Sequence, residues 1–430
     1  YIGGSNESFG RFNITGASFR EEWNAPMRSV KDINQILDIA EKNNQPQYKA
    51  LGLICKVYVL SLMTDAYGDI PYNEAGKGDV SGLEFPHYQE QKEVYRLMLA
   101  DLETANQLLK SLKADATISD DILFNGDAVK WRKYANSLKV RILMRQSAKK
   151  DVSADIAAIF NNAQEYPVFT SIDDQATLVY NNIQPKNLPS DGSGVIFGDN
   201  FRVSEAIVDA LQTKDDPRLP VYVAPTKHSF EAHRANASVP FVYRGQPAGL
   251  SAAEQNEIDK DDYSVLSSTI RSESRAFVMT FAELQFLKAE AIIRGMITGN
   301  AADEYAKGIR ASMQKWAAIS SDDVDVYLAR PDVALNTAQN EALKQIGTQA
   351  WIDSFLNGFE AFANWRRTGY PELKVGTSVS SAIPVRYIYS DNEQNNPNLI
   401  SWTNEKIGRM VNETDMVWFQ PQKWNTNVYR

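Results

Sequence analysis

The sequence predicts a mainly α-helical protein, a tetratricopeptide-like scaffold of helix pairs with long loop-rich insertions. Apolar side chains recur at steps of three and four along several long segments, which is the spacing of one face of a helix. Glycine or proline ends most of these segments, so neighbouring helices are expected to fold back on each other as hairpins. Recurring helix pairs are typical of tetratricopeptide-like solenoids, although no strict period of roughly 34 residues links these pairs.

The first hairpin is predicted within residues 47–109. A helix over 47–63 is indicated by an apolar stripe made of Tyr48, Leu51, Ile54, Tyr58 and Leu62. Gly68 and Pro71 end this helix, and a polar loop follows through Gly82. The second helix of the hairpin begins near Tyr88.

Further helices follow the same pattern. Asp127 is predicted as the N-cap of a helix that reaches Lys150 and pairs with a short helix over 154–163. A third hairpin is predicted from residues 281–294 and 305–316. Residues 338–362 supply at least one more long helix, with one aromatic face formed by Trp351, Phe355, Phe359 and Phe362. Tryptophans on helical stripes are assigned to the core, namely Trp131, Trp316, Trp351 and Trp365.

The chain is predicted to form a single domain over residues 1–430. The helix-pair scaffold covers about 25–168 and 277–370, and an irregular C-terminal segment, 371–430, wraps it. Between these parts, residues 169–276 lose the helical period, and only Val203–Gln212 reads as a clear helix. Loops of this length in a compact protein are usually functional, so this insertion is predicted to face a ligand.

Composition excludes some classes of protein. The formal net charge is −9, and the sequence has no run rich in Lys or Arg, so a nucleic-acid partner is not expected. The single cysteine, Cys55, lies in an apolar helical pattern and is predicted to be a buried, inert thiol. No run of about 18 apolar residues occurs, so no membrane span is predicted. Because the chain starts at Tyr1, any export signal is expected either to have been removed or to have been left out of this sequence.

The usual signatures of catalysis and metal binding are absent from the sequence. The segment Gly192–Gly198 lacks the spacing of a dinucleotide-binding turn, and no HExxH or GxSxG pattern occurs. The histidines, His87, His228 and His233, do not have zinc-ligand spacing. We therefore predict no catalytic residue, metal or cofactor. Two alternatives stay open: a glycosidase carboxylate pair, which no motif nominates, and a calcium site at Asp259, Asp261 and Asp262 in place of a solvated acidic turn.

Aromatic side chains outside the helical stripes are the candidate ligand contacts. A flat ring can stack on the apolar face of a sugar while neighbouring polar side chains bond its hydroxyl groups. The residues of this kind, all predicted to lie in loops, are Phe230, His233, Phe241, Tyr243, Tyr263 and Trp402.

Several segments resemble the SusD/RagB family of outer-membrane lipoproteins, in particular its SusD-like branch. Tyr67–Tyr72 resembles the YGDxPY turn of the family, and Lys130–Arg141 resembles its KWxxxANSLxxR helix. Further similar segments are spread over the chain: Asp216–Leu219, Tyr243–Leu250, Met279–Ala291 and Ser354–Pro371.

The resemblance implies an α-helical, non-catalytic protein that is lipid-anchored on the extracellular face of the outer membrane. It further implies capture of an oligosaccharide for a SusC-like, TonB-dependent transporter; the lipidated N-terminal cysteine of the family is not in this chain. Ligands of relatives bind in loops that correspond by position to residues 72–88 and 226–276. The positional candidates are Phe85, His87, Phe230, His233, Phe241, Tyr243, Arg244, Tyr263 and Trp402.

Other functions remain open from the sequence. The RagB side of the family allows a peptide as the ligand in place of an oligosaccharide. A surface glycoside hydrolase and an intracellular tetratricopeptide adaptor are further alternatives.

Overall fold

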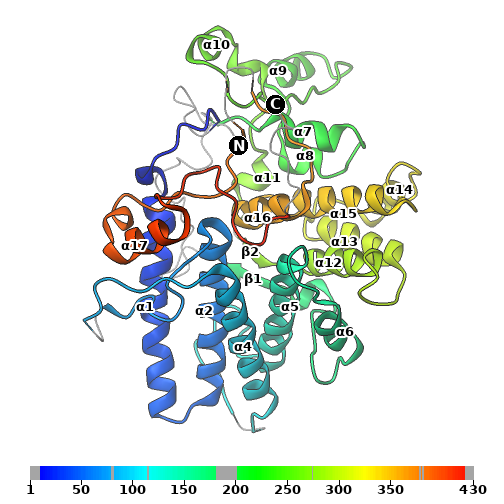
Figure 1. Cartoon of the computed structure of the whole chain (residues 1–430). Helices are drawn as coiled ribbons and strands as arrows, with labels where there is room; N and C mark the ends of the chain where they lie inside the picture. Colours follow the sequence, from blue (N-terminus) through cyan, green and yellow to red (C-terminus); the bar gives the residue numbers. More distant parts are fainter. Residues whose placement is uncertain are drawn as a thin grey trace.

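Most long helices of the protein form two groups, and an insertion with several short helices lies above them (Figure 1). The computed structural model describes residues 10–78, 82–113, 116–180, 201–273, 275–376, 379 and 382–421. The predicted mainly helical fold with paired helices is confirmed. The segment Gly192–Gly198 and Trp424 lie outside the described residues.

The first group of helices lies side by side in Figure 1. It comprises α1 (Arg20–Lys42), α2 (Pro46–Tyr67), α4 (Gln91–Lys110), α5 (Ala128–Gln146) and α6 (Ser153–Asn161). The sequence analysis missed α1, which buries only a narrow stripe containing Trp23, Val30 and Ile33. The first hairpin is therefore α1–α2, and α2 packs on α4 with its other side. As predicted, the Asp127 side chain caps α5, accepting from the backbone N–H groups of Val129 and Lys130.

Helix α2 is apolar on most of its circumference because it lies between α1 and α4. Among the described residues, it is the one helix whose length and composition would also suit a membrane span, and 67% of its most apolar stretch is buried inside the fold. Burial on both sides makes it a core helix. The same burial raises the pKa of the Cys55 thiol to about 12, which keeps this thiol protonated and unreactive.

The second group consists of α12 (Phe281–Ile293), α13 (Ala301–Gln314), α14 (Ser321–Leu328), α15 (Gln339–Asp353) and α16 (Gly358–Thr368). The predicted single aromatic face of Trp351, Phe355, Phe359 and Phe362 is wrong, because these residues are divided between α15, the turn after it and α16. The chain turns at Leu356, whose φ is 72°, and the Asn357 side chain caps the new helix α16 by accepting from Glu360 N. Phe355 therefore packs beside Tyr222, whereas Phe362 packs beside Tyr387.

The insertion between the two groups contains more structure than predicted. It has α7 (Glu205–Gln212), α8 (Leu219–Tyr222), α9 (Lys227–Ala235), α10 (Ala252–Glu257), α11 (Ser268–Arg271) and the 3-10 helices η2 (Ile172–Asp174) and η3 (Lys260–Asp262). Helix α7 corresponds to the helix predicted at 203–212, whereas the others are too short or too polar for an apolar period to show. Hydroxyl N-caps such as Thr226 and Ser267 begin several of them. The antiparallel strands β1 (Ala176–Val179) and β2 (Arg275–Met279) join the two ends of the insertion, with Val179 opposite Arg275.

The C-terminal segment crosses the first helix group and contains a helix of its own. Tyr387 N donates to the carbonyl of Ala66 over 2.9 Å, and the Tyr389 hydroxyl donates to the carbonyl of Asp69 over 2.7 Å. After η4 (Glu393–Asn395) it forms α17 (Pro397–Ile407), which Asn396 caps. A further 3-10 helix, η1 (Gly16–Phe19), precedes α1.

Buried ion pairs connect the two helix groups. Arg145 on α5 binds Asp65 of α2 (3.0 Å) and Glu360 of α16 (2.6 Å). Arg141, one turn earlier, binds Glu283 of α12 (2.5 Å) and lies 3.5 Å from Glu360. Burial alone would raise the pKa of Glu360, but the two arginines hold it below its ordinary value. This carboxylate is therefore charged and shared between the groups.

Glu360→Gln should destabilise the fold by about 3–5 kcal/mol, because it removes the buried carboxylate that Arg145 and Arg141 share and leaves Arg145 with Asp65 as its one ion-pair partner in the described structure. Urea unfolding followed by circular dichroism measures this loss. The control is Glu93→Gln, which removes an exposed pair with Arg96 and should change stability by less than about 0.5 kcal/mol. Equal effects of the two substitutions would contradict the proposed role of Glu360.

A second buried carboxylate, Glu290 on α12, binds Arg367 of α16 through both oxygens (2.6 and 2.7 Å). Burial opposes its charge, but Arg367 and Arg294 lower the pKa of Glu290 to about 2. Because the pKa of Glu290 is lower in the folded state than in the unfolded chain, where it is about 4.3, the ionised carboxylate stabilises the fold at pH values above about 4.3. This stabilisation is lost as the pH falls toward 2.

The stability difference between the wild type and Glu290→Gln should therefore shrink between pH 5 and 2, measured by urea unfolding at each pH. A difference that is constant over this range would contradict the assignment.

Candidate functional site

An exposed aromatic cluster on the insertion consists of Phe230, His233 and Phe241. The Phe230 and Phe241 rings are nearly parallel at 6.4 Å between centroids, and the His233 and Phe241 rings are 4.1 Å apart. Phe230 and Phe241 are 51% and 42% exposed, which is unusual for rings that contact each other. The prediction of a loop for Phe230 and His233 is wrong, because both lie on α9, three residues apart and thus on one face.

Local hydrogen bonds fix this aromatic cluster. Thr226 caps α9, and its backbone N–H donates to the carbonyl of Val242, so the segment that carries Phe241 runs along the start of the helix. The Ser229 hydroxyl accepts from Val242 N at 3.1 Å. His233 Nδ1 lies 2.6 Å from the carbonyl of Val239 and must donate to it, so the proton is on Nδ1 and Nε2 is an acceptor. The rings are therefore held in place without a ligand.

Two ion pairs are formed by the first two residues of α9. Lys227 Nζ lies 2.6 Å from Asp261, and His228 Nε2 lies 2.8 Å from Asp259. The hydrogen bond to Asp259 raises the pKa of His228 above its ordinary value. The described residues contain no group of three potential metal ligands. Two of the three carboxylates considered for calcium thus bind side chains of α9.

Tyr243 and Arg244 follow Phe241 in the chain, and Arg244 contacts Tyr263. The Arg244 guanidinium lies 4.8 Å from the centre of the Tyr263 ring, and Tyr263 itself is only 8% exposed. Tyr243 is half-buried against the core of the insertion. The exposed group among these three is Arg244.

The remaining candidates, Phe85, His87 and Trp402, belong to a different region. Trp402 is on α17 and Phe85 is bonded to that helix, which lies apart from α9 in Figure 1. Phe85 is 41% exposed, and its carbonyl accepts from Asn398 Nδ2 at 2.6 Å. The His87 ring pairs with Glu74 at 3.0 Å. Trp402 is on α17, not in a loop as predicted; its indole N–H donates to Asp69 at 2.9 Å, and it lines a cavity of about 490 Å³. The structure therefore divides the predicted site into two regions.

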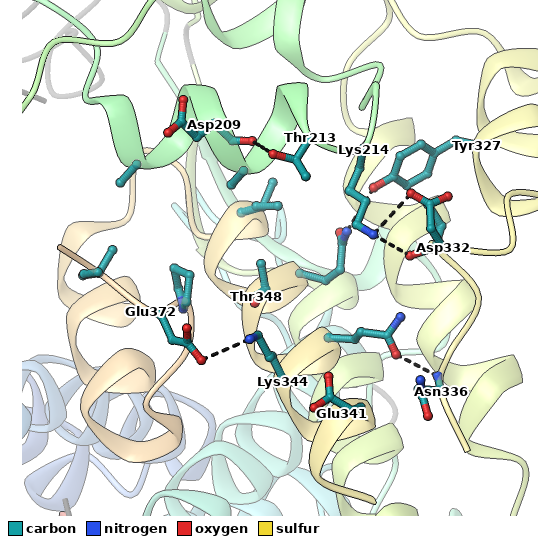
Figure 2. A pocket seen from close by; sticks show the side chains of 18 of the residues that line it. Asp209, Thr213, Lys214, Tyr327, Asp332, Asn336, Glu341, Lys344, Thr348 and Glu372 are labelled. Carbon is teal, nitrogen blue, oxygen red and sulfur yellow. Dashed lines mark hydrogen bonds and ion pairs between the residues drawn. The ribbon is translucent and has the colours of Figure 1, made fainter. Parts of the chain in front are cut away.

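A further cleft, which the sequence analysis missed, opens between α7 and α15 with a volume of about 610 Å³. Figure 2 shows Asp209 of α7, and Thr213 directly after that helix, facing Glu341, Lys344 and Thr348 of α15 across the opening. The α15 residues recur at steps of three and four along one helix face, which in sequence looks like an ordinary solvated face. Their position opposite α7 could not be inferred from that pattern.

Comparison with known proteins identifies the family. Residues 4–390 match the model of the SusD-like family described as starch-binding and associating with the outer membrane. The chain belongs to this SusD-like family. It is similar to an outer membrane protein of Bacteroides vulgatus assigned to nutrient binding, with 25% identity, a TM-score of 0.84, and coverage of 97% of this chain and 93% of that one. No curated protein matches the chain.

Two other solved structures have the same fold. A chitin-binding protein shares 26% identity and a TM-score of 0.81, with 98% of this chain and 92% of that chain covered. A SusD homologue of Bacteroides fragilis shares 24% identity and a TM-score of 0.79, with coverage of 97% and 96%. This SusD-like chain is accordingly an outer-membrane nutrient-binding protein of a non-catalytic family.

Buried residues in two of the segments that carry the SusD-like resemblance have structural roles. Arg218 in the Asp216–Leu219 segment is fully buried and binds Asp216 at 2.6 Å. Gly245 in the Tyr243–Leu250 segment packs so close to α7 that a Cβ atom there would lie 2.3 Å from Glu205 Cα. Its neighbour Gln246 exchanges backbone hydrogen bonds with Val203 and Glu205. These residues set the position of α7 and do not themselves form a ligand surface.

Proposed function

We propose that this SusD-like protein captures an oligosaccharide on the aromatic cluster of Phe230, His233 and Phe241. The observation that carries the proposal is the exposed pair of nearly parallel phenylalanine rings, fixed in place by backbone hydrogen bonds. Such rings match the flat apolar face of a sugar ring, and His233 Nε2 and the exposed Arg244 offer an acceptor and donors to its hydroxyl groups. The similarity to a chitin-binding protein supports a saccharide as the ligand.

The proposal includes delivery of the captured oligosaccharide to a SusC-like, TonB-dependent transporter, and attachment to the outer membrane by an N-terminal lipid. Family membership and outer-membrane association support both steps. A shallow stacking surface buries little area, so we expect dissociation constants of about 1 μM or weaker. Binding of this strength permits release to a transporter.

Phe230→Ala and Phe241→Ala should each weaken saccharide binding about tenfold, because each removes one stacking ring. Calorimetry with the chitin hexasaccharide and with maltoheptaose measures the affinity. Phe85→Ala is the matched control, since it removes an exposed phenylalanine of the other region and should leave the affinity unchanged. If the protein bound a peptide pool and no saccharide, the ligand would be a peptide and not an oligosaccharide. Equal losses of saccharide affinity in all three variants would contradict the site at Phe230 and Phe241.

The partner is tested separately. Affinity purification of the native protein from detergent-solubilised outer membranes should recover a TonB-dependent barrel in a comparable molar amount, as identified by mass spectrometry. Recovery without any barrel would contradict the delivery step. It would not affect the saccharide site, because Phe230 and Phe241 are tested on the isolated protein.

A further inference from the structure

Two adjoining cavities of different character meet beside α7. The first is the polar cleft between α7 and α15, with a volume of about 610 Å³. The second is an apolar trough of about 500 Å³ between α7, the turn at Leu356 and α16. Both volumes are those of small-molecule sites. Three residues line both cavities, namely Ser204, Ala206 and Leu373.

We propose that this composite cleft is a second binding site, for a neutral amphipathic glycoside. Its sugar end occupies the polar cleft and its alkyl or aryl end occupies the apolar trough. The site is built by α7, α15 and the turn before α16, and it shares no lining residue with the aromatic cluster on α9.

The polar cleft suits a neutral, hydroxyl-rich group. Two ion pairs lie in it, Lys214 with Asp332 at 3.2 Å and Lys344 with Glu372 at 3.0 Å (Figure 2). The carboxylates of Asp209 and Glu341, on opposite walls, have no hydrogen-bond or ion-pair partner within the described part of the chain. Carboxylates without a cation are strong acceptors for sugar hydroxyl groups.

The charges of the polar cleft also disfavour an anionic ligand. Five carboxylates line it, and only three lysines accompany them. Of these lysines, Lys214 and Lys344 are already bound to carboxylates. A phosphate, sulfate or carboxylate group would therefore meet net repulsion. A neutral sugar does not.

The apolar trough offers a sugar few groups for hydrogen bonds. Its walls are aromatic and aliphatic, and its hydroxyl groups are those of Ser204 and Ser354. Both are engaged: Ser204 accepts from Ala206 N, and Ser354 donates to the carbonyl of Ala350 at 2.9 Å. The apolar walls are formed by Val203, Ile207, Leu266, Trp351, Phe355 and Leu356. A hydroxylated ring placed there would lose its hydrogen bonds to water without replacement, whereas an alkyl or aryl group would gain by burial.

The trough is fixed in shape and open to solvent. The Phe355 ring stacks on Tyr222 at 4.3 Å and an interplanar angle of 5°, which holds one wall. Leu356 is 45% exposed at the mouth. At the junction of the two cavities stands Ala206, whose side chain is a single methyl group, so a continuous ligand can pass from one cavity to the other.

Octyl β-glucoside below its critical micelle concentration is the probe, and methyl β-glucoside and octanoate are the comparison compounds. Calorimetry on the full chain should show one octyl β-glucoside per chain, bound at least about 100-fold more tightly than methyl β-glucoside, because only the octyl chain fills the trough. Octanoate should not bind measurably. Asp209→Asn together with Glu341→Gln should reduce octyl β-glucoside binding and allow octanoate to bind.

Ala206→Arg should weaken octyl β-glucoside binding at least about tenfold, because the long side chain fills the junction. The matched control is Ala154→Arg on an exposed position of α6, which should leave binding unchanged. Circular dichroism melting of both variants shows whether each is folded. If Ala206→Arg does not fold, Ala210→Arg, which extends into the polar cleft alone, gives the same test of the sugar end.

Binding that persists in Ala206→Arg, several weakly bound molecules per chain, or no saturable binding would each overturn this inference. Phe230→Ala separates it from the proposed function. This substitution should weaken binding of the chitin hexasaccharide and leave octyl β-glucoside binding unchanged, so either site can fail without the other. Loss of octyl β-glucoside binding in Phe230→Ala would assign the probe to the aromatic cluster and refute the second site.

Discussion

The relative position of the two helix groups depends on the ion pairs buried between them. Apolar burial is non-directional and would tolerate small shifts of one helix group against the other. The ion pairs of Arg145 do not tolerate such shifts, because its planar guanidinium must bond to Asp65 of α2 and to Glu360 of α16 at the same time. Arg141 and Arg367 add links from α5 and α16 to α12. Charge matching at these points selects one arrangement of helices among those that would bury similar apolar area.

Both candidate binding surfaces are supported by the core of the insertion, which is continuous with the second helix group. Val208 and Leu211 of α7 and Tyr222 of α8 pack in one cluster with Trp316 and with Ile352 of α15. The helices on this core are short, yet hydroxyl caps and backbone hydrogen bonds order them. Both candidate surfaces are thus carried by short segments whose geometry the underlying core fixes.

Long, strongly periodic helices could be predicted from the sequence because each needs only its own apolar stripe. Asp127 was found as a cap for the same reason: its effect is local. Features that depend on distant residues could not be found. Helix α1 buries only a narrow stripe, and the break at Leu356 depends on a left-handed turn that leucine rarely adopts. Phe230, His233 and Phe241 were identified by residue type, but their contacts and their separation from Trp402 are products of the fold. The cleft between α7 and α15 joins residues more than a hundred positions apart, and no local pattern indicates it.

The strand pair β1–β2 has a consequence for how such a protein changes over time. Val179 and Arg275 are paired, so the chain leaves the helical frame and returns to it at the same place. The outer parts of the insertion, such as α9 and α10, contribute no residue to the core shared with the second helix group. These parts can be lengthened, shortened or exchanged while both attachment points stay where they are, so selection for a new nutrient can act on them with little change to the helical frame.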